Sequence, residues 1–171
     1  MIERNKNQEP GFISLDSCIL ALDSTNYNSL TRLLIMEIKE NELTENILVF
    51  YVQAESFPQG ITESFNKLDN LLGNKRDHHI YGITLCDGDK LIYRACAKEN
   101  FEGEATTLGL PIYTIPKGKY LYATLNKWLE NLAQIPGIFD ELMKQPNVKE
   151  QTICLEDYTS ADTMLAMVQH A

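Results

Sequence analysis

The sequence predicts an α+β fold in which tandem β-α-β-β repeats form one antiparallel sheet, with two helices on one face and a ligand groove on the other. Three observations support this prediction. Short apolar runs rich in β-branched and aromatic residues alternate with segments of helical periodicity. An Asp-Gly pair at 87–88 separates two strand-like runs, as in a β-hairpin. The order strand, helix, strand, strand then recurs along the chain, and two such units can pair edge to edge.

The first repeat begins at residues 47–52, a short apolar run typical of a buried strand. Pro58 precedes a helical segment that ends at Gly73-Asn74. Two strands follow, at 80–85 and at 90–97. The helix is expected to bury the face formed by Ile61, Phe65, Leu68, Leu71 and Leu72.

The second repeat follows a glycine-containing linker loop at 99–110. A turn or bulge is predicted at 116–119, inside its first strand region. Apolar spacing over 128–143 predicts a helix that Pro136-Gly137 interrupts. The predicted strand regions of this repeat are 112–125, 151–158 and 163–168.

Residues 1–45 are predicted to be an N-terminal extension, and residues 46–171 to be the ligand-binding domain. The first ten residues are polar and are expected to be disordered. The patterns at 12–22 and 30–39 fit a strand or a helix equally well, so the structure of the extension stays open.

Composition excludes several classes of protein. The chain has 171 residues, with 15 basic and 24 acidic residues and a net charge of −9. Because there is no basic stripe to neutralise phosphates, direct nucleic-acid binding is not expected. There is no apolar run of the roughly 18 residues that a membrane span needs, and no signal-peptide stretch. We therefore expect a soluble, cytoplasmic protein, monomeric or dimeric.

Neither a metal nor a cofactor is expected, because metal-ligand spacings, phosphate-binding glycine loops and nucleophile elbows do not occur in the sequence. The four cysteines, Cys18, Cys86, Cys96 and Cys154, are interpreted as reduced, buried, small apolar residues. His78-His79 is interpreted as a solvated pair at the start of a strand.

Strand alternation then predicts which side chains line the groove. If Ile153 and Leu155 face the helices, Glu156 and Tyr158 point into the groove. A carboxylate in an aromatic-walled cleft attracts organic cations by charge and by cation–π contact, and burial would raise its pKa. The alternative is that Glu156 lies on a solvated face. Leu91, Tyr93, Ala95 and Ala97 also share one face, where small side chains leave room for a guest.

Two motifs carry a resemblance to a known family. The first is Ile115-Pro116-Lys117-Gly118-Lys119-Tyr120, ahead of a helix, and the second is Leu155-Glu156-Asp157-Tyr158 on the penultimate strand. Their order and spacing resemble the GyrI-like small-molecule-binding domain, the effector-binding domain of AraC- and MerR-type multidrug regulators. The resemblance covers roughly residue 48 to the C-terminus, and Tyr81-Gly82-Ile83 also fits it.

The resemblance implies a hydrophobic groove in which Glu156 meets lipophilic cations beside Tyr158 and Tyr93. Tyr120 has a weaker claim to the groove, and a purely structural role is equally compatible with it. Trp128 is expected in the core or at the groove rim, with direct ligand contact as the alternative. Multidrug regulators also carry a DNA-binding domain, for which the first 45 residues show no convincing helix pair, so a stand-alone, bacterial form is expected.

Three functions remain open. The leading hypothesis is a binding protein that senses or sequesters amphipathic, cationic or planar compounds. Because the resemblance also extends to hydrolases that open strained cyclopropane rings, Glu156 with Tyr93 or Tyr158 could instead be catalytic. The third function is an acidic, protein-binding inhibitor. The sequence does not decide whether the protein is an enzyme.

Overall fold

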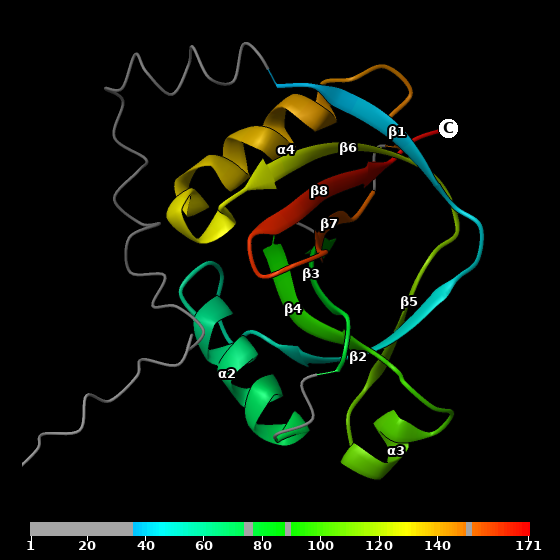
Figure 1. Ribbon diagram of the computed structural model, residues 1–171, viewed down its shortest axis with the longest axis vertical. Coiled ribbons are helices and arrows are strands. Elements are labelled where there is room, and N and C mark those ends of the chain that lie inside the picture. Colours follow the sequence, from blue (N-terminus) through cyan, green and yellow to red (C-terminus); the bar gives the residue numbers. More distant parts are fainter. Residues whose placement is uncertain (1–35, 74–76, 88–89, 150–151) are drawn as a thin grey trace, which may run out of the picture.

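The computed structural model describes residues 36–73, 77–87, 90–149 and 152–171 (Figure 1). This part of the chain forms an antiparallel sheet with helices packed against it, which confirms the α+β class. The elements in chain order are β1 (Ile38–Leu43), β2 (Ile47–Gln53), α2 (Ile61–Leu72), β3 (Ile80–Asp87), β4 (Lys90–Lys98), α3 (Glu104–Leu108), β5 (Ile112–Ile115), β6 (Gly118–Asn126), the 3-10 helices η3 (Trp128–Glu130) and η4 (Leu132–Gln134), α4 (Ile135–Met143), β7 (Cys154–Tyr158) and β8 (Thr163–Gln169).

The eight described strands lie in the order β1-β6-β8-β7-β3-β4-β2-β5, and every neighbouring pair is antiparallel. The first repeat is β2-α2-β3-β4, and the second is β6, α4, β7 and β8. The repeats meet at the centre of the sheet, where β3 pairs with β7. The tandem arrangement expected from the sequence is therefore present, and the sheet curls into a half-barrel.

The two ends of the sheet are connected through two pairs of consecutive strands. β1 and β2 follow one another and pair, in turn, with β6 and β5, which are also consecutive in the chain. At the junction, the Asn46 side-chain oxygen accepts a hydrogen bond of 2.8 Å from the Lys117 backbone amide. This junction lies at the turn predicted over 116–119. β1 belongs to the stretch assigned to the N-terminal extension, and its pairing with β6 makes that part of the extension an edge strand of the sheet.

Both described long helices pack on the same face of the sheet (Figure 1). Phe65 and Leu68 of α2 bury against Phe50 and Ala95. In the second repeat, α4 residues bury against β6 and β8, and this cluster contains Ala123, Leu125, Ile138, Phe139, Leu142, Met164, Ala166 and Val168. Burial of these side chains stabilises the layered arrangement by about 25 cal/mol per Å² of apolar surface.

The opposite, concave face carries a second apolar core rather than an open surface. Its buried residues are Val49, Tyr81, Ile83, Cys96, Ile115, Tyr120, Ile153, Leu155 and Met167. The predicted orientation of β7 is therefore wrong: Leu155 lies in this core, while Cys154 and Tyr158 pack on the helix side. The cause is the curl of the sheet, which buries both of its faces. Side chains on the two faces of β7 therefore do not alternate between apolar and polar, and the alternation rule cannot identify the helix-bearing face. Three of the candidate groove residues, Glu156, Tyr158 and Tyr93, thus lie on the helix-bearing face.

Two local predictions also need correction. The second helix does not run from 128 to 143, because the first part forms η3 and η4 and α4 begins at Ile135. Pro136 opens α4 instead of interrupting a helix, as expected for a residue whose missing N–H costs nothing in the first turn. The linker loop contains the short helix α3. Gly88 of the predicted Asp-Gly turn and the pattern at 12–22 lie outside the described residues, although the strands β3 and β4 on either side of that turn pair as predicted.

The described cysteines are free thiols, but they are not all buried. Cys96 is fully buried, and burial raises the pKa of the partly buried Cys154 thiol to about 12. Cys86 is exposed, contrary to the prediction, and lies in the exposed last two residues of β3. Cys18 lies outside the described residues.

Candidate functional site

A buried carboxylate lies at the centre of the sheet. Glu156 on β7 is 7% exposed and pairs with Gly82 of β3 on one side and Ala166 of β8 on the other. Its oxygen Oε2 accepts a 2.8 Å hydrogen bond from the Tyr93 hydroxyl and a 2.5 Å hydrogen bond from the Tyr158 hydroxyl. The structure therefore brings together three of the residues predicted from sequence. The alternative that Glu156 lies on a solvated face is wrong.

The electrostatics of this cluster follow from its burial. Desolvation raises the pKa of Glu156, and the hydrogen bonds from Tyr158 and Tyr93 offset part of that rise by stabilising the charged form. Desolvation also raises the pKa of Tyr93 and of Tyr158 well above the ordinary value, so both side chains remain hydroxyl donors. Among the described residues, Glu156 has no basic side chain within ion-pair distance. A ligand cation would meet a carboxylate that has no other positive partner there.

Gly82 makes this geometry possible, and the sequence analysis did not assign it a role. Tyr93 is on β4 and Glu156 is on β7, with β3 between them. A Cβ atom at Gly82 would lie 2.1 Å from the Tyr93 hydroxyl oxygen and 2.7 Å from Glu156 Oε2. Tyr93 therefore reaches Glu156 across the bare backbone of β3. A glycine in the middle of a strand pattern is the sequence signal that could have shown this close approach.

Aromatic side chains surround the tyrosine pair. Phe65 of α2 makes edge contacts with Tyr93 and Tyr158, at centroid distances of 6.0 and 5.9 Å. Phe57 stacks on Tyr93 at 6.4 Å, and Trp128 of η3 meets Tyr158 edge-on at 4.7 Å. Phe57 and Phe65 were missed as site residues because helical periodicity explains Phe65 as core and the loop position of Phe57 has no pattern.

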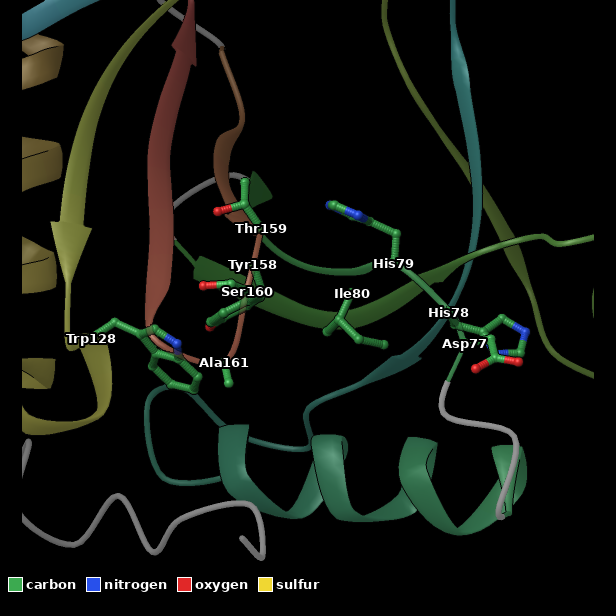
Figure 2. A pocket seen from close by; sticks show the side chains of 9 residues that line it. All are labelled: Asp77, His78, His79, Ile80, Trp128, Tyr158, Thr159, Ser160 and Ala161. Carbon is green, nitrogen blue, oxygen red and sulfur yellow. The ribbon is translucent and has the colours of Figure 1, made fainter.

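A cavity of about 400 Å³ opens beside Tyr158, between α2 and the end of β7 (Figure 2). Trp128 stands at one end of it and Asp77 at the other. Glu156 and Tyr93 do not line the cavity, whereas Tyr158 lines it and donates its hydroxyl hydrogen bond to Glu156. The lining consists of Asp77, His78, His79, Ile80, Trp128, Tyr158, Thr159, Ser160 and Ala161.

Two other sequence interpretations can be placed. Tyr120 lies on the concave face, fully buried, and its hydroxyl donates a 2.7 Å hydrogen bond to the Pro116 carbonyl, so the structure does not bring it to the cavity. The interpretation of His78-His79 as a solvated pair is wrong for His78, which is buried 2.9 Å from Glu104. His79 lies 2.5 Å from Asp157 and lines the cavity.

Within the described ranges, no group of three or more His, Cys, Asp or Glu side chains is arranged to hold a metal ion. Among the helices that the structure describes, none is long and apolar enough to span a membrane.

Comparison with known proteins places the fold. No family model matches the sequence, and no curated protein matches it. An integron cassette protein from Vibrio cholerae is similar in structure, with a TM-score of 0.60 and 15% identity over 80% of this chain and 97% of that one. SAV2435, solved bound to tetraphenylphosphonium, has a TM-score of 0.53 and 11% identity over 78% and 93% of the two chains. A hydrolase from Listeria innocua has a TM-score of 0.54 and 7% identity over 79% and 92%.

The architecture and the site define an α+β domain of two β-α-β-β repeats, with an acidic, aromatic cluster under its helices. The integron cassette protein and SAV2435 share this fold, which agrees with the fold that the family resemblance implied.

Proposed function

We propose that this chain binds small, amphipathic organic cations in the cavity beside Tyr158, with Glu156 as the acidic anchor, and serves in sensing or sequestration. The observation that carries the proposal is the buried Glu156 carboxylate, which is held by two tyrosine hydroxyls and has no basic partner among the described residues. The similar fold of SAV2435, whose structure was solved with tetraphenylphosphonium, supports the class of ligand.

The aromatic side chains define how such a cation would bind. Trp128 and Tyr158 present ring surface to the cavity, and cation–π contact with a desolvated ring contributes about 2 kcal/mol. Since the Tyr158 hydroxyl donates a hydrogen bond to Oε2 of Glu156, a cation on the Tyr158 ring would be close to the Glu156 charge without contacting it. Direct contact with the carboxylate requires Tyr158 to give up that hydrogen bond and move aside.

Three compounds of similar size and different charge test the proposal: tetraphenylphosphonium, triphenylphosphine oxide and tetraphenylborate. Trp128 is the only tryptophan in the chain, so its fluorescence reports binding from the cavity wall. We expect saturable quenching by the cation, weaker binding of the neutral compound, and at least a tenfold loss of cation affinity in Glu156→Gln. A tenfold loss corresponds to about 1.4 kcal/mol.

Glu42→Gln is the matched control, because it makes the same substitution at an exposed position of β1 that does not line the cavity. Its cation affinity should stay within about twofold of the wild type. Equal losses in the two variants would assign the effect to net charge and contradict the role of Glu156. Equal binding of all three compounds would contradict charge selection altogether.

A second candidate function is hydrolysis. The arrangement of two hydroxyl donors on one carboxylate can activate water and stabilise a developing oxyanion, and the fold is shared with a hydrolase from Listeria innocua. Incubation with strained, cyclopropane-containing compounds followed by mass spectrometry tests it. Addition of one water that Tyr93→Phe abolishes, with binding retained, would establish an enzyme; binding without any new product would leave the binding function alone.

A further inference from the structure

Arg94 lies on the concave face, on the side of β4 opposite to its neighbour Tyr93. Its guanidinium carbon is 4.3 Å from the centre of the Tyr51 ring and 5.2 Å from the centre of the Tyr113 ring. These tyrosines come from β2 and β5, the two strands that follow β4 toward the sheet edge (Figure 1). The three residues, Arg94, Tyr51 and Tyr113, are called the arginine clamp below.

The charge of Arg94 has no acidic partner in the part of the chain that the structure describes. Its side chain forms no ion pair there, and its Nε atom is buried without a hydrogen-bond acceptor. In a chain with 24 acidic and 15 basic residues, an unpaired cation is unexpected, and Lys67 by contrast meets both Glu55 and Glu63. A buried N–H without an acceptor carries a free-energy cost that a ligand can remove.

The Arg94 side chain is only partly buried, so part of it can meet a ligand. Two tyrosine rings lie within cation–π range of its guanidinium carbon, and a planar guanidinium carries its N–H donors along its edge. That edge matches a carboxylate, which can accept two parallel hydrogen bonds. Burial raises the pKa of Tyr113, so this tyrosine stays a neutral phenol and does not supply the missing negative charge.

The surroundings favour a carboxylate with an apolar body. Tyr51 and Tyr113 are only partly buried and pack against the concave core, so their rings offer apolar surface beside the charge. We propose that the arginine clamp is a second ligand site, on the face opposite the Glu156 cluster, and that it binds a small carboxylate with an aromatic or other apolar body. The proposal does not depend on the proposed cation site, because the two sites share no residue.

Three naphthalene compounds test the clamp: 2-naphthoate, the neutral 2-naphthylmethanol and the cationic 2-naphthylmethylammonium, each titrated by calorimetry. We expect saturable binding of naphthoate by the wild type, at least tenfold tighter than that of the alcohol. Arg94→Met should weaken naphthoate at least tenfold. Arg94→Lys, which keeps the charge but loses the planar edge, should weaken it by less than Arg94→Met but by at least threefold.

Lys98→Met is the matched control, since it removes one positive charge from an exposed position of the same strand. Lys98→Met and Glu156→Gln should each bind naphthoate within twofold of the wild type. A separate readout uses the wild type alone: in a ¹⁵N spectrum, the Arg94 Nε–H signal, identified by its absence in Arg94→Lys, should shift on addition of naphthoate.

The outcomes separate clearly. Absence of saturable naphthoate binding by the wild type would overturn the proposal, as would unchanged affinity in Arg94→Met or an Arg94 Nε–H signal that does not move. If Arg94→Met fails to fold, Arg94→Lys and the wild-type spectrum still decide. Loss of naphthoate binding in Glu156→Gln with retention in Arg94→Met would show that the compound enters the other site, and would refute the clamp while leaving the proposed cation site to its own test.

Discussion

Gly82→Ala is the sharpest test of the geometry around Glu156. An added Cβ would lie 2.1 Å from the Tyr93 hydroxyl oxygen, whereas ordinary contact begins at 3.4 Å, so the hydroxyl must retreat by about 1.3 Å (3.4 − 2.1). A shift of this size breaks the 2.8 Å hydrogen bond to Glu156. Loss of a hydrogen bond to a charged group costs about 1.5–3 kcal/mol. Without the clash, the exchange of glycine for alanine would instead stabilise the protein by about 0.4–1 kcal/mol, through the unfolded chain.

The two effects have opposite signs, and the clash is the larger. We therefore expect Gly82→Ala to lower the free energy of unfolding by about 0.5–2.6 kcal/mol, measured by urea denaturation followed by circular dichroism. The same substitution should weaken tetraphenylphosphonium binding, because the carboxylate loses a donor that positions it.

A double-mutant cycle shows whether the Tyr93 hydroxyl is the cause. Tyr93→Phe removes the atom at 2.1 Å, so Gly82→Ala should cost at least about 1 kcal/mol less in that background than in the wild type. Additive effects of the two substitutions, or a Gly82→Ala protein at least as stable as the wild type, would refute the reasoning that β3 must be bare at this point.

Three further predictions concern pH, thiols and a buried histidine. Burial raises the pKa of Glu156 above that of an unfolded carboxyl, about 4.3, so the stability present at low pH is lost as pH rises through the folded pKa. The free energy of unfolding of Glu156→Gln should therefore rise relative to that of the wild type, by up to about 1.4 kcal/mol per pH unit. A constant difference in urea midpoints from pH 4 to 8 would contradict this. Cys86 should react with maleimide in the native protein and Cys96 only after unfolding, as peptide mapping would show; native labelling of Cys96 would mean that the concave core opens. His78→Ala removes one partner of the buried contact with Glu104 and should cost about 1–3 kcal/mol in urea denaturation, whereas a change below 0.5 kcal/mol would show that the contact contributes little.

The architecture could be predicted from sequence because the strongest signals are local. An Asp-Gly pair follows the predicted strand β3 and precedes β4, and α2 has a single apolar face. Both the hairpin and the helix can therefore be predicted from short stretches of sequence. The start of α4 could not be predicted in the same way. Trp128, Leu129 and Leu132 have helical spacing, but three residues per turn and 3.6 per turn look alike over so short a stretch, and the chain forms 3-10 helices there.

The orientation of β7 failed for a different reason. The alternation of side chains along a strand identifies the core face only where the other face of the sheet meets solvent. Along β7 both faces of this sheet are covered. Ile153 and Leu155 are buried in the concave core, while Cys154 and Tyr158 pack under the helices. Both sets are apolar or aromatic, and the curl that buries them arises from the pairing of β1–β2 with β5–β6, which no local pattern in β7 records.

The central cluster shows where sequence reasoning could go further. Glu156 and Tyr93 are 63 positions apart, and the family resemblance implied that they share a groove. What the types could not show is that a third strand runs between them. In the observed register Gly82 lies opposite Glu156 on one side and Ala95 on the other, so the residue of β3 that lies between Tyr93 and the carboxylate has no side chain. Glycine is disfavoured inside strands, so a glycine in the middle of β3 predicts that a side chain or another backbone approaches this strand closely at that point. Together with a buried acid on the neighbouring strand and a tyrosine on the next, this predicts a hydrogen bond across the glycine, and the Gly82→Ala and Tyr93→Phe cycle is therefore a test of the register as well as of the site.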